Sequence, residues 1–200
     1  MYFSYAHVGS DEGGVFKSLD GGNSWFQVSN GLPQMTVAPH IGEYCPINKL
    51  LIDPNSPDTI YAGIGNESAL VYGSGCWGVL KSVNGGINWS RATQPFGHGL
   101  PEDLLYDLAF NPDNSNVIYA GTARQSVYVS SDAGLTWEEI PLGVENIYDI
   151  ISDLAIIDTS PQNLYLGMND EGIFRLTIPP ALGVKPISGI PPIWWTLELG

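Results

Sequence analysis

The chain has 200 residues, of which 44% are hydrophobic, so it is long enough to bury a core. Its formal net charge is -14, from 21 acidic and 7 basic residues, and this charge repels phosphate backbones and anionic membrane surfaces. These properties argue against nucleic-acid binding. The sequence also has no run of about 18 apolar residues, so no membrane insertion is expected.

Residues 1–32 are expected to supply strands two, three and four of a first four-stranded unit. They contain an eight-residue turn at 18–25, Ser-Leu-Asp-Gly-Gly-Asn-Ser-Trp. We expect a hairpin there, in which the Asp accepts backbone N–H groups, a Gly takes positive φ and the Trp caps the turn. The N-terminus has neither a basic start nor a cleavage site, so no signal peptide is predicted in this chain.

The sequence predicts two complete meanders of four antiparallel strands, one over residues 47–93 and one over residues 104–142. Each begins with an apolar run, a turn rich in Pro, Asn, Asp and Ser, and a second apolar run. A third strand then leads into a further copy of the turn, at 82–89 and 130–137. Internal repeats with a period of a few tens of residues indicate a solenoid, a propeller or an array.

Residues 150–178 predict the first three strands of a fourth unit. The C-terminal run 193–199 fills either its missing outer strand or the missing inner strand of the first unit. The prediction is therefore a single all-β array over residues 1–200, a β-propeller of about four blades of four-stranded antiparallel meanders. Two alternatives stay open: a closed ring, and an incomplete propeller that is part of a larger one or forms a homo-oligomer through its incomplete blades.

The three turns resemble the Asp-box (BNR) repeat, which is found in β-propellers. The second copy departs from the pattern, with Asn84 for Asp and Asn88 for Ser or Thr. The resemblance implies propellers similar to those of sortilin (VPS10)-type receptors, xyloglucanase-type glycoside hydrolases and photosystem assembly factors, and a secreted or periplasmic location. The residues that carry it are Ser18, Asp20, Gly22, Trp25, Ser82, Asn84, Gly86, Trp89, Ser130, Asp132, Gly134 and Trp137.

The long irregular connections are expected at the end of each meander opposite to the turns. Long loops on a rigid scaffold are where ligands bind, whereas Asp20 and Asp132 are expected only to close their hairpins. Aromatic rings in or next to these loops are candidates for stacking on sugar rings, with packing of the loops onto the blades as the alternative. These candidate ligand-binding residues are Tyr44, Tyr72, Trp77, Phe96 and Tyr106.

Asp107 and Asp153 are the candidate catalytic residues, because they occupy equivalent positions at the start of two inner strands. Glycoside hydrolysis needs two carboxylates on either side of the scissile bond. The alternative is that each Asp caps the turn before its strand, and Lys49 at the equivalent place in the second unit weakens the catalytic reading.

Cys45 and Cys76 both fall at the long-loop end of the second unit and are a candidate disulfide. A bridge there closes a loop of about 30 residues and contributes about 3–4 kcal/mol, and two unpaired thiols are the alternative. No Cys or His pair has the spacing of metal ligands, so no metal and no other cofactor is expected.

Three functions are consistent with these features. The first is a non-enzymatic module that binds a carbohydrate or protein partner through its long-loop face. The second is a segment of a glycoside hydrolase that acts on polysaccharide. The third is a structural, self-associating fragment, since exposed edge strands promote association.

Overall fold

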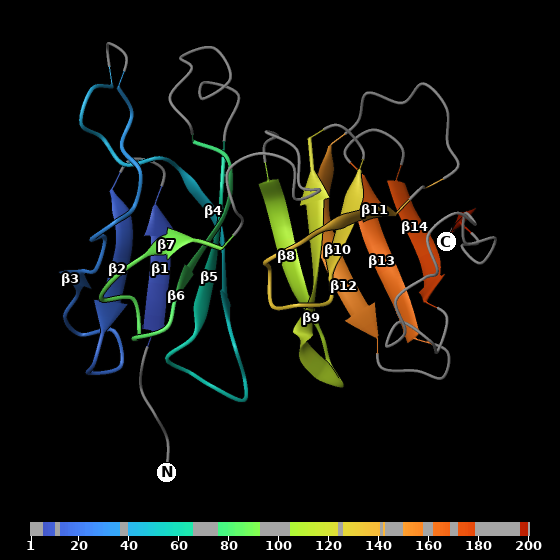
Figure 1. Cartoon of the computed structure of the whole chain (residues 1–200), viewed down its shortest axis with the longest axis horizontal. Coiled ribbons are helices and arrows are strands. Elements are labelled where there is room, and N and C mark those ends of the chain that lie inside the picture. The colour runs from blue at the N-terminus through green and yellow to red at the C-terminus, as the bar shows by residue number, and fades with distance from the viewer. Residues whose placement is uncertain are drawn as a thin grey trace. The chain divides into compact units, whose positions relative to one another are not determined.

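The computed structural model describes residues 6–10, 13–36, 40–65, 76–92, 105–123, 126–140, 142, 150–157, 162–168, 172–178 and 197–199. The regular elements in these ranges are β-strands in four antiparallel sheets (Figure 1). The chain divides into two compact units, residues Met1–Gln94 with Pro101–Leu105 and residues Pro95–Leu100 with Tyr106–Gly200. Within the described ranges, no helix has the length and apolar character needed to cross a membrane.

The first unit holds two sheets in which consecutive strands are neighbours. The first sheet contains β1 (Ala6–Ser10), β2 (Gly14–Ser18) and β3 (Phe26–Gln27). The second sheet contains β4 (Ile47–Ile52), β5 (Ile60–Ile64), β6 (Gly78–Ser82) and β7 (Ser90–Arg91).

The two sheets of the first unit pack face to face. A Cβ on Gly9 in β1 would lie 2.6 Å from Ile47 Cγ2, so only glycine allows this approach to β4. The second sheet is also tied to the first by hydrogen bonds from Trp89, whose Nε1 donates to the Val28 carbonyl at 2.7 Å and whose backbone N donates to the Asn30 carbonyl at 2.8 Å.

The second unit also holds two meanders, with Leu105 at its boundary. The third sheet contains β8 (Leu105–Asn111), β9 (Asn114–Thr122), β10 (Val127–Ser130) and β11 (Glu138–Ile140). The fourth sheet contains β12 (Ile151–Ile157), β13 (Gln162–Met168), β14 (Gly172–Ile178) and β15 (Leu197–Leu199). Because β15 pairs with β14, with Leu197 opposite Leu176, the end of the C-terminal run takes the outer position of the fourth sheet.

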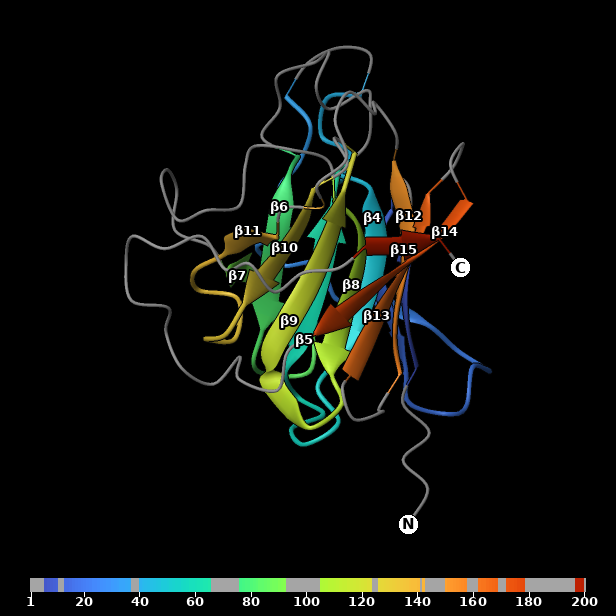
Figure 2. The ribbon, with the colours of Figure 1, turned by 90° about the vertical axis from the view of Figure 1, so that its right-hand side faces the viewer.

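The core of the second unit lies between its two sheets, which run side by side in both views (Figures 1 and 2). Tyr119 and Val127 of the third sheet belong to the same apolar cluster as Leu166 and Phe174 of the fourth. A Cβ on Gly121 would lie 2.7 Å from Ile151 Cγ2, which repeats the contact of Gly9 with Ile47 in the first unit. Sheets stacked in this way, each a short meander, are the blades of a β-propeller.

Candidate functional site

The three eight-residue turns connect β2 to β3, β6 to β7 and β10 to β11, and they share one hydrogen-bond pattern. In the first turn the buried hydroxyl of Ser18 accepts the N–H of Gly22 at 2.8 Å and donates to Asp20 Oδ1 at 2.9 Å. Ser82 and Ser130 make the same contacts in the other two turns. The serine therefore holds the turn closed from inside.

The acidic side chains complete the first and third turns. Asp20 accepts both the N–H of Ser24 at 2.8 Å and its hydroxyl at 2.6 Å, and Asp132 accepts the same two groups of Thr136 at the same distances. In the second turn Asn84 accepts the N–H of Asn88 at 2.9 Å. These side chains are occupied within their own turns.

The hydrogen bonds lower the pKa of both carboxyl groups. The hydroxyl and N–H of Ser24, followed by the hydroxyl of Ser18, lower the pKa of Asp20 from 3.8 to about 2. Burial raises the pKa of Asp132, but the bonds from Thr136 and Ser130 outweigh it, so the net pKa is lowered. Both turns are thus stabilised by the charged form of their Asp.

We expect Asp20→Asn and Asp132→Asn together to weaken the dependence of stability on acid pH. A lowered folded-state pKa stabilises the protein above the unfolded value, and this contribution is lost as the pH falls through the folded value. For Asp20 that window runs from pH 3.8 down to about 2. Urea unfolding at a series of pH values from about 5 to 2 measures the effect. Asn84 in the second turn has no such titration, so Asn84→Gln is the control, and equal acid sensitivity in all proteins would contradict the prediction.

The two candidate catalytic acids lie in different environments within the second unit. Asp107 in β8 is buried, and its carboxylate accepts the N–H of Leu108 and, in β12, the N–H of Leu154, both at 2.8 Å. Asp153 is exposed on β12. The carboxylate of Asp107 thus joins the inner strands of two sheets, as a structural role requires, and the catalytic role of the pair remains a prediction.

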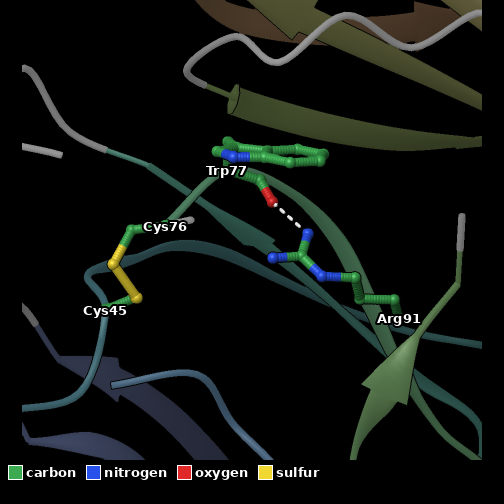
Figure 3. Close-up of a disulfide and its surroundings, with 4 residues drawn as sticks. All are labelled: Cys45, Cys76, Trp77 and Arg91. Carbon is green, nitrogen blue, oxygen red and sulfur yellow. Dashed lines mark hydrogen bonds between the residues drawn. A yellow bond between two sulfur atoms is a disulfide. The ribbon is translucent and has the colours of Figure 1, made fainter. Parts of the chain in front are cut away.

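A disulfide organises the long-loop end of the first unit. Cys45 and Cys76 are bonded, with their Cα atoms 5.3 Å apart (Figure 3). The bridge joins the segment before β4 to the segment before β6, so it brings their chain neighbours Tyr44 and Trp77 into one region. Tyr44 and Trp77 are both half-buried.

The indole of Trp77 is held from one side by Arg91. The guanidinium carbon lies 4.4 Å from the ring centroid, and Nη1 donates to the Trp77 carbonyl at 2.9 Å (Figure 3). A cation on a ring face and a hydrogen bond to the same residue restrain the orientation of the indole. Sequence reasoning missed this role of Arg91, because the contact depends on β7 pairing beside β6, which brings Arg91 to a residue 14 positions earlier in the chain.

The remaining candidate ligand-binding residues do not all join this region. Tyr106 is half-buried on β8 in the second unit, and Tyr72 and Phe96 lie outside the described residues. Near Tyr44 the sequence adds a polar pair, His40 Nδ1 and Glu43 Oε2, at 2.7 Å. The described residues contain no group of three or more side chains that could hold a metal ion.

Comparison with known proteins supports a β-propeller. No family model matches the chain. It is 27% identical over 143 residues to a xyloglucanase of Hypocrea jecorina, and 27% identical over 157 residues to a xyloglucanase of Acetivibrio thermocellus. These alignments cover 68% and 64% of this chain but 16% of each relative, so the chain spans about a sixth of their length.

Solved structures share the fold at low sequence identity. An ancestral GH74 enzyme superposes with a TM-score of 0.58 at 18% identity, over 86% of this chain and 21% of that one. A structure of YCF48 bound to D1 peptide gives a TM-score of 0.54 at 16% identity, over 90% and 50%. The chain therefore has an all-β propeller fold similar to that of GH74 enzymes and of YCF48.

Proposed function

We propose that this chain is a non-enzymatic β-propeller module that binds a polysaccharide at its long-loop end, with Trp77 as the stacking platform. The observation that carries the proposal is the restraint on Trp77, which follows the disulfide-bonded Cys76 in the chain and has the guanidinium of Arg91 over its ring. An aromatic ring fixed before binding stacks on a sugar without a large loss of side-chain freedom.

The geometry suggests how a sugar is held. Arg91 covers one face of the indole, so a pyranose ring stacks on the other. Glu43 and Tyr44 lie directly before Cys45, in the segment that the disulfide links to the one holding Trp77. Tyr44 supplies a second ring, and the Glu43 carboxylate supplies hydrogen-bond acceptors for sugar hydroxyl groups. The relatives named xyloglucanases make xyloglucan the polysaccharide to test first.

The burial of Asp107 favours binding over hydrolysis. A carboxylate whose oxygens accept two backbone N–H groups is engaged in holding the sheets together, which leaves it poorly placed for acid or base catalysis. The alternative is hydrolysis by a pair of carboxylates that includes the exposed Asp153. The observation that favours this alternative is that the relatives are named xyloglucanases. A peptide is the other ligand class, because a similar structure, YCF48, is bound to one.

We further propose a secreted or periplasmic location and a single array for the whole chain. Disulfides persist in oxidising compartments, and this one joins two segments 31 residues apart. The array consists of blades at residues 1–32, 47–93, 104–142 and 150–178, with 193–199 added to the last.

Trp77→Ala is expected to weaken binding to xyloglucan by about tenfold or more, because loss of a stacking ring costs at least about 1.4 kcal/mol. Isothermal titration calorimetry with xyloglucan oligosaccharides measures the change. Phe26→Ala is the matched control, since Phe26 is an exposed ring on β3, outside the two segments that the disulfide joins, and it should leave the affinity unchanged.

The same samples distinguish the alternatives. Reducing-end assays after long incubation should show no cleavage, and cleavage that is lost in Asp153→Asn would establish the hydrolase instead. Wild-type protein that binds neither xyloglucan nor cellulose oligosaccharides would refute the carbohydrate proposal and direct attention to peptides.

A further inference from the structure

The dipeptide Asn-Gly occurs twice in the chain, as Asn30–Gly31 and Asn84–Gly85, and both copies lie in the first unit. Such a pair favours spontaneous deamidation, because glycine has no side chain to hinder attack by its backbone nitrogen on the side-chain amide of the asparagine. The attack requires that the glycine N–H is unoccupied and that the local backbone can move. Two copies of one dipeptide in one unit therefore allow a direct comparison of their surroundings.

In the second copy, both polar backbone groups of Gly85 are engaged. Its N–H donates to the Asp58 carbonyl at 2.8 Å, and its carbonyl accepts a hydrogen bond from Lys17 Nζ, on β2, at 3.0 Å. Gly85 is buried, and Oδ1 of Asn84 accepts the N–H of Asn88 within the turn. The nitrogen of Gly85 therefore cannot attack the side-chain carbon of Asn84 until these bonds break.

The first copy has a different environment, because Asn30 and Gly31 are both exposed. They are the central residues of a turn that is closed by a hydrogen bond from the N–H of Leu32 to the Ser29 carbonyl at 3.0 Å. Within the part of the chain that the structure describes, the N–H of Gly31 has no hydrogen-bond partner. The Asn30 side chain donates from Nδ2 to Asn88 Oδ1 at 2.5 Å. The attacking nitrogen is thus available in the first copy and occupied in the second.

We propose that Asn30 is a site of spontaneous deamidation in the folded protein and that the fold protects Asn84 from the same reaction. The Gly31 nitrogen loses its proton and forms a bond to Cγ of Asn30, while the Cγ–Nδ2 bond breaks and Nδ2 leaves as ammonia. Water then opens the cyclic imide at either of its carbonyl groups. The products are aspartate and isoaspartate, and no reactant other than water is needed.

The modification falls on a contact between the first and second sheets. The Asn30 carbonyl accepts the backbone N–H of Trp89 at 2.8 Å, and a Cβ on Gly31 would lie 2.2 Å from the Trp89 carbonyl oxygen. In isoaspartate this carbonyl becomes a free carboxylate, and the main chain is longer because it runs through Cγ. The close fit against Trp89 is then lost, so isoaspartate at this position destabilises the contact. The proposal does not depend on glycan binding, because it involves neither Trp77 nor the disulfide.

Peptide mapping by mass spectrometry, after incubation of the folded protein in mildly alkaline buffer, tests the proposal. Trypsin places Asn30 in residues 18–49 and Asn84 in residues 82–91, so fragment ions follow the two sites separately. Asn30 should convert about tenfold faster than Asn84 or more, the ratio expected when a hydrogen bond must break before Gly85 can react. In urea the two rates should converge. Equal rates in the folded protein, or no conversion at Asn30, would overturn the proposal.

Urea unfolding of the incubated protein tests the effect on the contact between the sheets. Incubated wild type should unfold at a lower urea concentration than fresh wild type. Asn30→Gln should keep its own midpoint through the incubation, because its longer side chain closes a ring much more slowly. Asn30→Asp carries the new charge on an unaltered main chain and should stay close to fresh wild type. An unchanged midpoint after conversion at Asn30, or an equal loss in Asn30→Asp, would overturn the inferred destabilisation by isoaspartate.

Discussion

Trp137→Ala is expected to lower the free energy of unfolding by about 3–5 kcal/mol, the usual cost of removing a buried large side chain. Trp137 is 3% exposed, and its Nε1 donates to the Gly134 carbonyl at 3.1 Å. For a domain of this size the loss corresponds to a decrease of about 6–20 °C in the melting temperature. Urea unfolding followed by circular dichroism measures the change directly.

Trp25→Ala provides a matched control for this prediction. Trp25 has the same place in its turn and makes the same hydrogen bond, from Nε1 to the Gly22 carbonyl at 3.1 Å, but it is 41% exposed. We expect it to cost about 1 kcal/mol, near the value of one hydrogen bond. The difference between the two variants isolates the contribution of burial. Equal losses would show that the hydrogen bond, not the packing of the ring, is what the turn requires.

The turns could be predicted from the sequence because the hydrogen bonds of their Ser and Asp or Asn side chains are local. Ser18 bonds to residues two and four positions away, and Asp20 to the residue four positions after it. A short motif therefore contains both partners of each hydrogen bond. The all-β propeller followed from the same repetition, and the comparison structures confirm it.

The environment of a single acid could not be predicted in this way. Asp107 and Asp153 begin the same Asp-Leu-Ala motif, yet the first is buried and the second exposed. The difference arises because Asp107 faces the fourth sheet and reaches Leu154, 47 residues along the chain. Such a partner is fixed by how sheets stack, which a repeat motif indicates only in general terms.

The exposure of Trp25 has the same origin. Its turn matches the motif at least as well as the second copy does, so sequence similarity alone assigns it the same packed role. Its exposure depends on what packs beside the first sheet, which the motif does not encode. Trp25 on the turn of the first sheet and Ile173 on the fourth sheet are the exposed members of their repeat positions, whereas Trp89, Trp137 and Val127 are buried.

Removal of the disulfide is expected to destabilise the protein and to weaken glycan binding together. The bridge closes a loop of 31 residues, and a loop of that length corresponds to about 3–4 kcal/mol of stability. Cys45→Ala with Cys76→Ala should therefore lower the free energy of unfolding by that amount. The bridge also fixes the residue before Trp77, so the variant should bind xyloglucan more weakly than the wild type under conditions where both are folded.

A reducing agent separates the bridge from the side chains that form it. Reduced wild-type protein should unfold at nearly the same urea concentration as the double variant, and the variant itself should not respond to reduction. If reduction leaves both the unfolding midpoint and the glycan affinity of the wild type unchanged, the bridge is not what holds Trp77. The restraint would then come from Arg91 alone, and Arg91→Met, which retains much of the packing but removes the charge and the donor, would be the variant that abolishes binding.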